Sequence, residues 1–321
     1  MTRSDTAPQA ALARAGIDRA AAERDEPGIV DRLRADATTR VVAVHGDRGL
    51  IATGSRLHTV APADVRADAE WAFLGRDADG AAVLLAATPA RAEPPVALTP
   101  STPGGAQWAS LRAIGGELDP VDAGLLVEAV ALGGWLVDAP FCPACGARTV
   151  TRLAGWARRC PSCGREHFPR TDPAVIVAVS SADGERLLLG KNALWAQRNM
   201  YSTFAGFVEA GESLETALAR EIHEEAGVVV ASCQYRGSQA WPYPRSLMLG
   251  FQATCTPDSV ARVDGVEIVD ARWFTRAELA ALLAGDPARG LAEDGGRPGV
   301  SLPGTASIAY SLIVDWVETV P

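Results

Sequence analysis

The sequence predicts an α+β chain of several domains, and three features carry that prediction. Residues 40–86 alternate β-type runs with Gly/Asp turns, which is typical of a β-rich N-terminal domain. Two Cys-Pro-x-Cys-Gly motifs, beginning at Cys142 and Cys160, indicate a small ribbon held by four cysteines. A strand pair at 174–190, followed by an acidic amphipathic helix near 213–226, indicates a C-terminal domain with a mixed sheet.

The domain boundaries follow from composition and from Pro/Gly punctuation. Residues 1–26 are rich in Ala, Arg and Asp without an apolar period, so we expect a flexible arm there. We expect the remaining domains to span 27–138 (N-terminal), 139–168 (ribbon) and 169–321 (C-terminal). The Pro/Gly-rich run at 285–304 is predicted to be a loop.

Elements of the N-terminal domain can be assigned in chain order. Strands are predicted at 40–47 and 71–86, the latter interrupted by a turn at Asp79-Gly80. A helix is predicted to open at Asp119-Pro120, since proline is favoured in a first helical turn. Its apolar positions continue to Leu136, so it leads directly into the ribbon.

Composition bounds the class of protein. The chain has 321 residues, of which 48% are hydrophobic, enough to form two cores and a ribbon. We find no apolar run of 18 residues and expect no membrane span. A net charge of −9 disfavours unspecific binding to a nucleic-acid backbone, but a divalent ion would still allow an anionic small ligand.

The two cysteine motifs predict a metal site. Fourteen residues separate them, and a glycine follows each second cysteine, where the chain must turn back. Two disulfides are the alternative interpretation. No apolar leader opens the chain, so we expect a cytoplasmic protein, and reduced thiols favour zinc. Four thiolates without histidine predict one structural Zn²⁺ per chain, with the ligands Cys142, Cys145, Cys160 and Cys163.

The other two cysteines, Cys233 and Cys255, have no motif around them. We predict that both are buried thiols.

The acidic helix predicts a second metal site. At ~100° per residue, Glu221, Glu224 and Glu225 fall within one arc of the helix. Such like charges repel each other unless a cation lies over them, and hard oxygen ligands suit Mg²⁺ or Mn²⁺. A solvated helix face is the alternative interpretation. The flanking Gly206 and Gly227 and an adjoining apolar stripe argue for a built site.

These residues carry a family resemblance. Residues 206–228 fit the pattern G-x5-E-x7-R-E-U-x-E-E-x-G-U at every fixed position and so resemble the Nudix box of diphosphate hydrolases. Residues 238–246 read Ser-Gln-Ala-Trp-Pro-Tyr-Pro-Arg-Ser and resemble the S-Q-P-W-P-F-P-x-S signature. Together with the ribbon, this stretch makes the chain resemble the NADH pyrophosphatase (NudC-type) family. Ala240 departs from a proline, which frees one backbone torsion, and Tyr243 departs from phenylalanine.

The resemblance implies a fold and an activity. The C-terminal domain would be a Nudix α/β/α sandwich with a mixed sheet. The reaction would be Mg²⁺- or Mn²⁺-dependent hydrolysis of NAD⁺ or NADH to nicotinamide mononucleotide and AMP. Removal of NAD caps from RNA 5′ ends, a reaction known as RNA deNADding, would be an extension of this chemistry. The family also implies a homodimer.

The resemblance also implies residue roles. Arg220, Glu221, Glu224 and Glu225 would be catalytic, with Arg220 fixing a box carboxylate. The catalytic metal would be held by Ala205, Glu221, Glu225 and Glu267. Either Glu224 or Glu267 would accept the proton of the attacking water, and the sequence leaves this choice open.

Substrate contacts are implied along much of the chain. Phe207 and Phe168 would stack on rings of the substrate. Tyr310 stands where the family has an arginine. The residues expected to bind substrate are Arg112, Phe168, Phe207, Gln239, Trp241, Tyr243, Ser246 and Ala309.

Two other functions stay open. A Nudix hydrolase of ADP-ribose, of a dinucleoside polyphosphate or of another nucleoside diphosphate derivative would share the box but not the signature at 238–246. A nucleic-acid-binding protein, with a zinc ribbon and an inert Nudix fold, would be expected to have a broken box. The box is intact.

Overall fold

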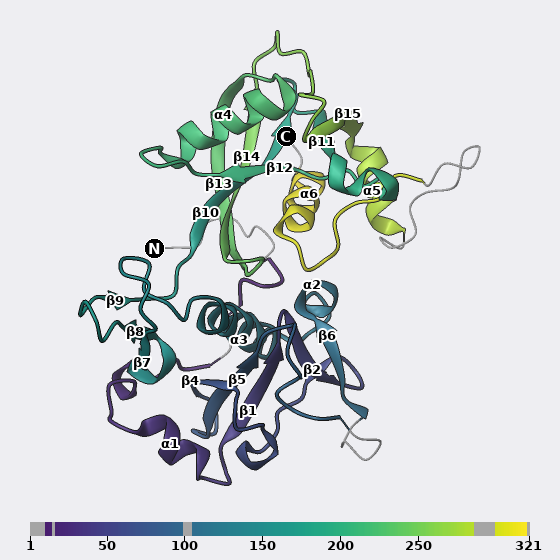
Figure 1. Ribbon diagram of the computed structural model, residues 1–321. Coiled ribbons are helices and arrows are strands. Elements are labelled where there is room, and N and C mark those ends of the chain that lie inside the picture. Colours follow the sequence, from purple (N-terminus) through teal and green to yellow (C-terminus); the bar gives the residue numbers. More distant parts are fainter. Residues whose placement is uncertain (1–9, 15–16, 99–104, 286–298, 320–321) are drawn as a thin grey trace. The chain divides into compact units, whose positions relative to one another are not determined.

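The computed structural model of the chain describes residues 10–14, 17–98, 105–285 and 299–319. Within it the chain forms two compact units. Figure 1 shows the ribbon of the chain, coloured by residue number. The N-terminal unit comprises residues 14–171 and 241–245. The C-terminal unit comprises residues 1–13, 172–240 and 246–321.

The N-terminal unit is built on a six-stranded mixed sheet. Its strands are β1 (Arg40–His45), β2 (Arg48–Ala52), β3 (Arg56–Leu57), β4 (Glu70–Arg76), β5 (Ala82–Thr88) and β6 (Gln107–Ser110). They run in the order β3-β2-β1-β5-β4, and β6 pairs with β2. Because β1 and β5 are parallel while β2 and β4 are antiparallel to their neighbours, the sheet is mixed.

Helix α3 (Pro120–Asp138) packs on this sheet. The carboxylate of Asp119 caps it by accepting the N–H groups of the next turn, as the Asp-Pro pair predicts. A Cβ atom on Gly49 of β2 would lie 2.5 Å from Leu126 Cδ1, so the close approach of helix and sheet requires glycine there. Among the described residues, α3 is the one helix long and apolar enough to cross a membrane, although Asp122 and Glu128 interrupt its apolar residues. However, 61% of its apolar window is buried, as in a core helix.

The remaining elements of the N-terminal unit are short. They are α1 (Ile29–Arg34), α2 (Leu111–Ile114) and the 3₁₀ turns η1 (Ala21–Glu23) and η2 (Pro62–Asp64).

Several of the described residues before Pro27, where a flexible arm is expected, pack against the rest of the chain. Ala10 is buried in a core of the C-terminal unit, and Leu12 is buried with its N–H donating to Gln239. In the N-terminal unit, Asp18 forms a β-bridge with Arg76, and Glu23 pairs with the same arginine at 2.7 Å. The segment lacks an apolar period because it packs in separate short pieces.

The ribbon belongs to the N-terminal unit. It contains the three-stranded sheet β7 (Val150–Arg152), β8 (Ala157–Arg159) and β9 (Glu166–His167), with the turn η4 (Leu153–Gly155) between the first two strands. Trp156 Nε1 donates to the carbonyl of Phe73 at 2.8 Å. This bond ties the ribbon to β4.

The C-terminal unit is built on a second mixed sheet. Its strands are β10 (Asp172–Ser180), β11 (Arg186–Asn192), β12 (Phe204–Phe207), β13 (Val230–Trp241), β14 (Ser246–Cys255) and β15 (Ile268–Thr275). The order is β13-β14-β10-β11-β15, with β12 paired to β10. The strands β10 and β11 form the predicted antiparallel hairpin, and β10 runs parallel to β14.

Helices cover both faces of this sheet. On one face Val175 and Val177 pack against α4 (Leu214–Ala226). On the other face Ile176 and Ala178 pack against α5 (Arg276–Ala284) and α6 (Ile308–Glu318). Because alternate side chains of β10 enter different cores, the strand is apolar throughout. The six-residue turn η5 (Ala193–Arg198) follows β11.

The predicted multidomain α+β fold is therefore confirmed. It has a β-rich N-terminal domain, a four-cysteine ribbon and an α/β/α sandwich with a mixed sheet. Most of the predicted loop at 285–304 lies outside the described residues.

Candidate active site and zinc centre

The acidic helix α4 is fixed by its caps and its apolar face. The hydroxyl of Ser213 accepts an N–H group of the first turn. At the other end, Gly227 has φ 66° and donates to the carbonyl of His223, so the C-cap needs the left-handed conformation that glycine allows. Leu218 and Ile222 are buried in the core, which leaves the acidic side chains on the rest of the helix.

Arg220 organises the loop that precedes this helix. Its guanidinium donates to both carboxylate oxygens of Glu212, to Glu221 at 2.8 Å and to Glu224 at 3.1 Å. It also donates to the carbonyl of Phe207 at 3.0 Å, so it joins the end of β12 to α4. The hydrogen bond from Arg220 lowers the pKa of Glu212 to about 2. Arg220 is thus a positioning residue for the carboxylates.

Glu225 lies deepest in the site. Only 6% of the residue is exposed, and its Oε2 atom is buried without a hydrogen-bond partner. Burial, followed by repulsion from Glu267 and Glu221, raises the pKa of Glu225 to about 8, although the N–H of Ala205 donates to it. A buried carboxylate in this state requires either a proton or a cation.

Glu221 fits against the backbone of β12. A Cβ atom on Gly206 would lie 2.0 Å from the carboxyl carbon of Glu221. The space beside Gly206 is therefore filled by the carboxylate itself, which explains physically why the motif begins with glycine. Glu221 comes in this way beside Ala205, the strand residue expected to offer its carbonyl to a metal.

Glu267 precedes β15 and is exposed. Asn192 Nδ2 lies 3.4 Å from its Oε1. The carboxylate of Asp264 accepts the backbone N–H groups of Glu267 at 2.9 Å and of Ile268 at 2.8 Å. Asp264 thus fixes the backbone that carries Glu267. Sequence reasoning missed this residue, although an aspartate followed by Gly265 is a turn signal.

Glu224 is the most exposed carboxylate of the helix site. Its side chain is 58% exposed, against 14% for Glu221. Both alternatives for the proton acceptor, Glu224 and Glu267, are therefore open to water.

The oxygen donors fit a hard divalent cation in their chemistry. The oxygen of Glu225 is buried without a hydrogen-bond partner, and Glu267 and Glu221 repel its charge, so the site suits a cation held by oxygen ligands. Among the described residues, the four ribbon cysteines are the group whose ligand atoms already converge to metal-binding spacing.

Two aromatic residues expected to stack on substrate are accessible. Phe207, at the end of β12, is 55% exposed. Phe168 is 58% exposed, and it follows β9 in the N-terminal unit.

Gln239, which the resemblance implies as a substrate-binding residue, has a buried side chain in this structure. Gln239 is 1% exposed, and its amide donates to the carbonyl of Ala306 at 3.0 Å and accepts from the N–H of Leu12 at 3.4 Å. It is occupied in joining the N-terminal segment to the loop before α6. The side chains of Ser246 and Ala309 are also buried.

Three other expected substrate residues lie together in the N-terminal unit. The Arg112 guanidinium lies 4.2 Å from the ring centroid of Tyr243 and 5.5 Å from that of Trp241. The two aromatic rings are 4.9 Å apart in an edge-to-face arrangement. This cluster joins α2 to the Trp-Pro-Tyr-Pro segment. Tyr310, in contrast, lies half-buried in the first turn of α6.

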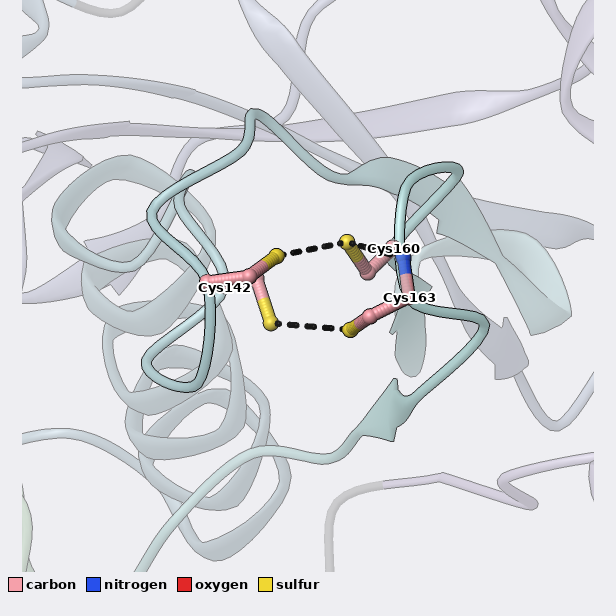
Figure 2. A group of neighbouring side chains, drawn as sticks. Cys142, Cys160 and Cys163 are labelled. Atoms are coloured by element: carbon pink, nitrogen blue, oxygen red, sulfur yellow. Dashed lines mark hydrogen bonds between the residues drawn. The ribbon is translucent and has the colours of Figure 1, made fainter.

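The four ribbon cysteines form a preformed metal site. Their sulfur atoms lie within 4.8 Å of one another, and Figure 2 shows Cys142, Cys160 and Cys163 pointing into a common space. The Sγ distances are 3.7 Å between Cys142 and Cys163, and 3.4 Å between Cys145 and Cys160. A tetrahedral Zn–S₄ site has sulfur atoms about 3.8 Å apart, so Zn²⁺ fits.

The surroundings of the thiolates support the same assignment. His167 Nε2 lies 3.3 Å from Cys142 Sγ. The N–H of Cys163, the first of several backbone donors, lowers the pKa of Cys160 to about 6. Both effects favour the thiolate that binds zinc. Cys255 is buried as expected, but the same prediction is wrong for Cys233, which is exposed on β13.

Comparison with known proteins places these features in families. The NUDIX domain model matches residues 170–293, and the NADH pyrophosphatase zinc ribbon model matches residues 138–168. The model of an NADH pyrophosphatase-like rudimentary NUDIX domain matches residues 38–135.

Several relatives resemble the whole chain or much of it. NAD-capped RNA hydrolase NudC of Mycobacterium tuberculosis is 40% identical over 314 residues, which cover 95% of this chain and 94% of that protein. NAD-capped RNA hydrolase NUDT12 of Macaca fascicularis is 36% identical over 213 residues, covering 64% and 44%. A solved NUDIX hydrolase from Nitrosomonas europaea is 27% identical with a TM-score of 0.33, covering 43% of this chain and 78% of that one.

The sheet, the acidic helix and its glycine-bounded loop define an enzyme of the Nudix hydrolase class. The chain belongs to the NADH pyrophosphatase (NudC-type) family of these hydrolases, and it carries the zinc ribbon of that family. The resemblance stated from the sequence is confirmed.

Proposed function

We propose that the chain hydrolyses the diphosphate of NAD, both as free NAD⁺ or NADH and as the cap of an RNA 5′ end. The oxygen of water forms a bond to one phosphorus while the bridging P–O bond breaks. The products are nicotinamide mononucleotide and either AMP or RNA with a 5′ monophosphate. The names of the relatives, which cover most of the chain, support this choice of substrate.

One observation carries the chemistry. The unpartnered oxygen of Glu225 is buried next to Glu221 and Glu267, whose charges raise its pKa. This arrangement suits a site that is complete only with a cation and an anionic ligand.

The ligand set suits Mg²⁺ or Mn²⁺, held by Glu221, Glu225, Glu267 and the carbonyl of Ala205. Such an ion neutralises diphosphate oxygens and lowers the pKa of a bound water. The protein supplies positioning: Arg220 orients Glu221, and Asp264 holds the backbone of Glu267. Glu224 or Glu267 accepts the proton of the water.

Product analysis tests the substrate. Purified protein would be incubated with NAD⁺, NADH, ADP-ribose or NAD-capped RNA, with Mg²⁺, with Mn²⁺ or without metal, and products separated by chromatography. Nicotinamide mononucleotide from the dinucleotides and from capped RNA is the expected result. Turnover of ADP-ribose alone would overturn the substrate but leave the metal site in place.

The carboxylate site is tested by Glu225→Gln. We expect turnover to be abolished while the fold remains intact, because the substitution removes a buried metal ligand. Glu215→Gln is the matched control, since Glu215 is exposed in the first turn of the same helix and the change in charge is equal. Near-normal metal-dependent turnover by Glu225→Gln would refute the assignment.

We also propose a homodimer, on the strength of the family resemblance. Sedimentation equilibrium would give about twice the chain mass of 33.5 kDa for a dimer. A single species of monomer mass at the enzyme's working concentration would contradict it.

A further inference from the structure

Charge is distributed very unevenly along this acidic chain. Residues 139–171, the ribbon and the three residues that follow it, contain six arginines, no lysine and one acidic residue, Glu166. Their formal net charge is +5, while the whole chain carries −9. Four thiolates with one Zn²⁺ would subtract two charges, so the ribbon stays positive with its metal bound.

Five of these six arginines are exposed: Arg148, Arg152, Arg159, Arg165 and Arg170. The sixth, Arg158, is buried, pairs with Glu70 and donates to the carbonyl of Leu136. Arg158 therefore has a structural role that accounts for it. The exposed arginines require another explanation.

Most of the exposed ribbon arginines lack an acidic neighbour. Within the described ranges, no carboxylate lies within 4.0 Å of the guanidinium of Arg148, Arg152, Arg159 or Arg165. Elsewhere in the same unit several exposed arginines are paired, for example Arg32 with Glu26 and Arg66 with Asp68, although Arg48 and Arg91 have no carboxylate partner among the described residues. The positive charge of the ribbon is thus not neutralised locally.

Exposed apolar groups are interspersed with these charges. In β8, Arg159 lies opposite Val150 of β7, so both side chains project from the same face of the ribbon sheet. Val150 is 51% exposed. Phe141 is 56% exposed, and the Arg148 guanidinium lies 5.9 Å from its ring centroid. An aromatic face next to unpaired guanidinium groups suits nucleotides, because rings stack on bases while arginine binds phosphate.

We propose that the exposed surface of the ribbon, defined by Phe141, Arg148, Arg152, Arg159 and Arg165, binds the single-stranded RNA that follows the NAD cap. This inference rests on the proposed function, because it assigns a second contact to the same substrate. Single-stranded RNA is favoured over a duplex, since stacking on Phe141 requires an unpaired base. Free NAD has no RNA body, so its hydrolysis does not depend on this surface.

Direct binding provides the first test. A fluorescein-labelled single-stranded RNA of ~10 nucleotides would be titrated with the full chain, carrying Glu225→Gln to prevent turnover, and anisotropy recorded across salt concentrations. Adding Arg152→Glu and Arg159→Glu should weaken binding about tenfold or more. It should also reduce the salt slope by about 1.4, or ~0.7 per lost phosphate contact.

The matched control is Arg32→Glu with Arg34→Glu on α1, which changes the total charge equally outside the ribbon. This control should bind RNA nearly as well as the parent protein. Phe141→Ala should weaken binding severalfold, while keeping the charge unchanged. Each variant must contain one zinc per chain by elemental analysis, which shows that the ribbon is folded.

Kinetics provides the second test. In protein that keeps Glu225, the double variant Arg152→Glu with Arg159→Glu should lower kcat/KM for NAD-capped RNA about tenfold by raising KM. It should leave the turnover of free NAD⁺ unchanged. An equal loss for both substrates, or an equal loss by the α1 control, would overturn the proposal. So would equally tight, equally salt-dependent binding of polyglutamate, which would mark a surface for acidic proteins.

The two proposals fail in different ways. If neither NAD⁺ nor capped RNA is hydrolysed, the proposed function is wrong, and the anisotropy result still decides whether the ribbon binds RNA. If both are hydrolysed but the ribbon variants bind RNA normally, only the ribbon proposal is wrong.

Discussion

The guanidinium of Arg220 donates to both carboxylate oxygens of Glu212, at 2.7 Å from Nε and 2.8 Å from Nη2. Glu212 also accepts the N–H of Glu209 at 3.0 Å, so this ion pair closes the loop between β12 and α4. Two motif positions eight residues apart therefore form a brace for the carboxylates rather than direct contacts to a substrate. Bidentate pairing explains why the brace needs arginine instead of lysine.

The Glu212 brace should make stability depend on acid pH. Hydrogen bonds from Arg220 lower the pKa of Glu212 to about 2 in the folded protein, below its ordinary value of 4.5. The stabilisation is therefore present above pH 4.5 and is lost as the pH falls towards 2. We expect Glu212→Gln to flatten the stability profile across this window, as measured by urea unfolding. Parallel profiles for the two proteins would show that the pair contributes no stability.

Glu225 should have the opposite effect in metal-free protein. Burial raises its folded pKa to about 8 from 4.5, so stability is highest below pH 4.5 and declines as the pH rises through 8. With a chelator present, Glu225→Gln should be more stable than the parent at pH 9, by about 2–4 kcal/mol. Mg²⁺ should then stabilise only the parent. If calorimetry showed equal stability for Glu225→Gln and the parent at pH 9, Glu225 would not be a buried carboxylate that needs a metal ion.

Gly206 should not tolerate a side chain. Because its Cβ would lie 2.0 Å from the carboxyl carbon of Glu221, alanine there must displace the carboxylate. We expect Gly206→Ala to reduce kcat about 100-fold or more, since misplaced catalytic groups are this costly. Gly134→Ala on α3, where a Cβ meets nothing within 4 Å, is the control. Equal kcat values for Gly206→Ala and Gly134→Ala would show that the space for the Glu221 carboxylate beside Gly206 is not required.

Asp264 should act on turnover through Glu267. Asp264→Ala removes the acceptor of two backbone N–H groups and frees the segment that carries Glu267. We expect kcat to fall about tenfold with little change in KM for NAD⁺, and the metal concentration needed for half-maximal turnover to rise. Asp258→Ala, at an exposed position after β14, is the control. A variant with normal metal dependence would rule out the positioning role.

Zinc should be structural. Cys160→Ser removes one of four converging ligands, so we expect loss of zinc, exposure of the ribbon to protease and a lower unfolding temperature. Free NAD⁺ should still be hydrolysed at the chemical step by protein that remains folded. If removal of zinc from folded enzyme stopped that step in single-turnover measurements, zinc would be catalytic.

Local patterns in the sequence identified much of the architecture because they depend on neighbours along the chain. The caps Ser213 and Gly227 bound α4 as the pattern predicts, and the cysteine spacing alone indicated the zinc ligands. Signals that depend on distant packing were interpreted less well. The segment before Pro27 was expected to be flexible, yet Ala10 is buried by residues more than 150 positions away.

The residues of the signature at 238–246 have different surroundings in the structure, and the sequence did not predict this difference. Its residues are adjacent in the chain and were assigned one role, substrate binding. In the structure, Gln239 is buried in the C-terminal unit, while Trp241 and Tyr243 pack with Arg112 in the N-terminal unit. Gln239 and Trp241 are two residues apart on β13, so strand alternation alone would give them the same face. Their surroundings differ because the chain passes from the C-terminal unit to the N-terminal unit after Ala240.

By itself, the sequence determined the reaction class, the zinc ligands and the set of carboxylates, because each depends on residue type at a fixed local spacing. Tertiary structure decided which carboxylate is buried, since only the packing of α4 against β12 removes Glu225 from water and brings its carboxylate to the N–H of Ala205. It also decided that Arg220 is a brace and that Asp264 supports Glu267. Those roles arise from contacts formed by folding, and residue spacing does not specify them.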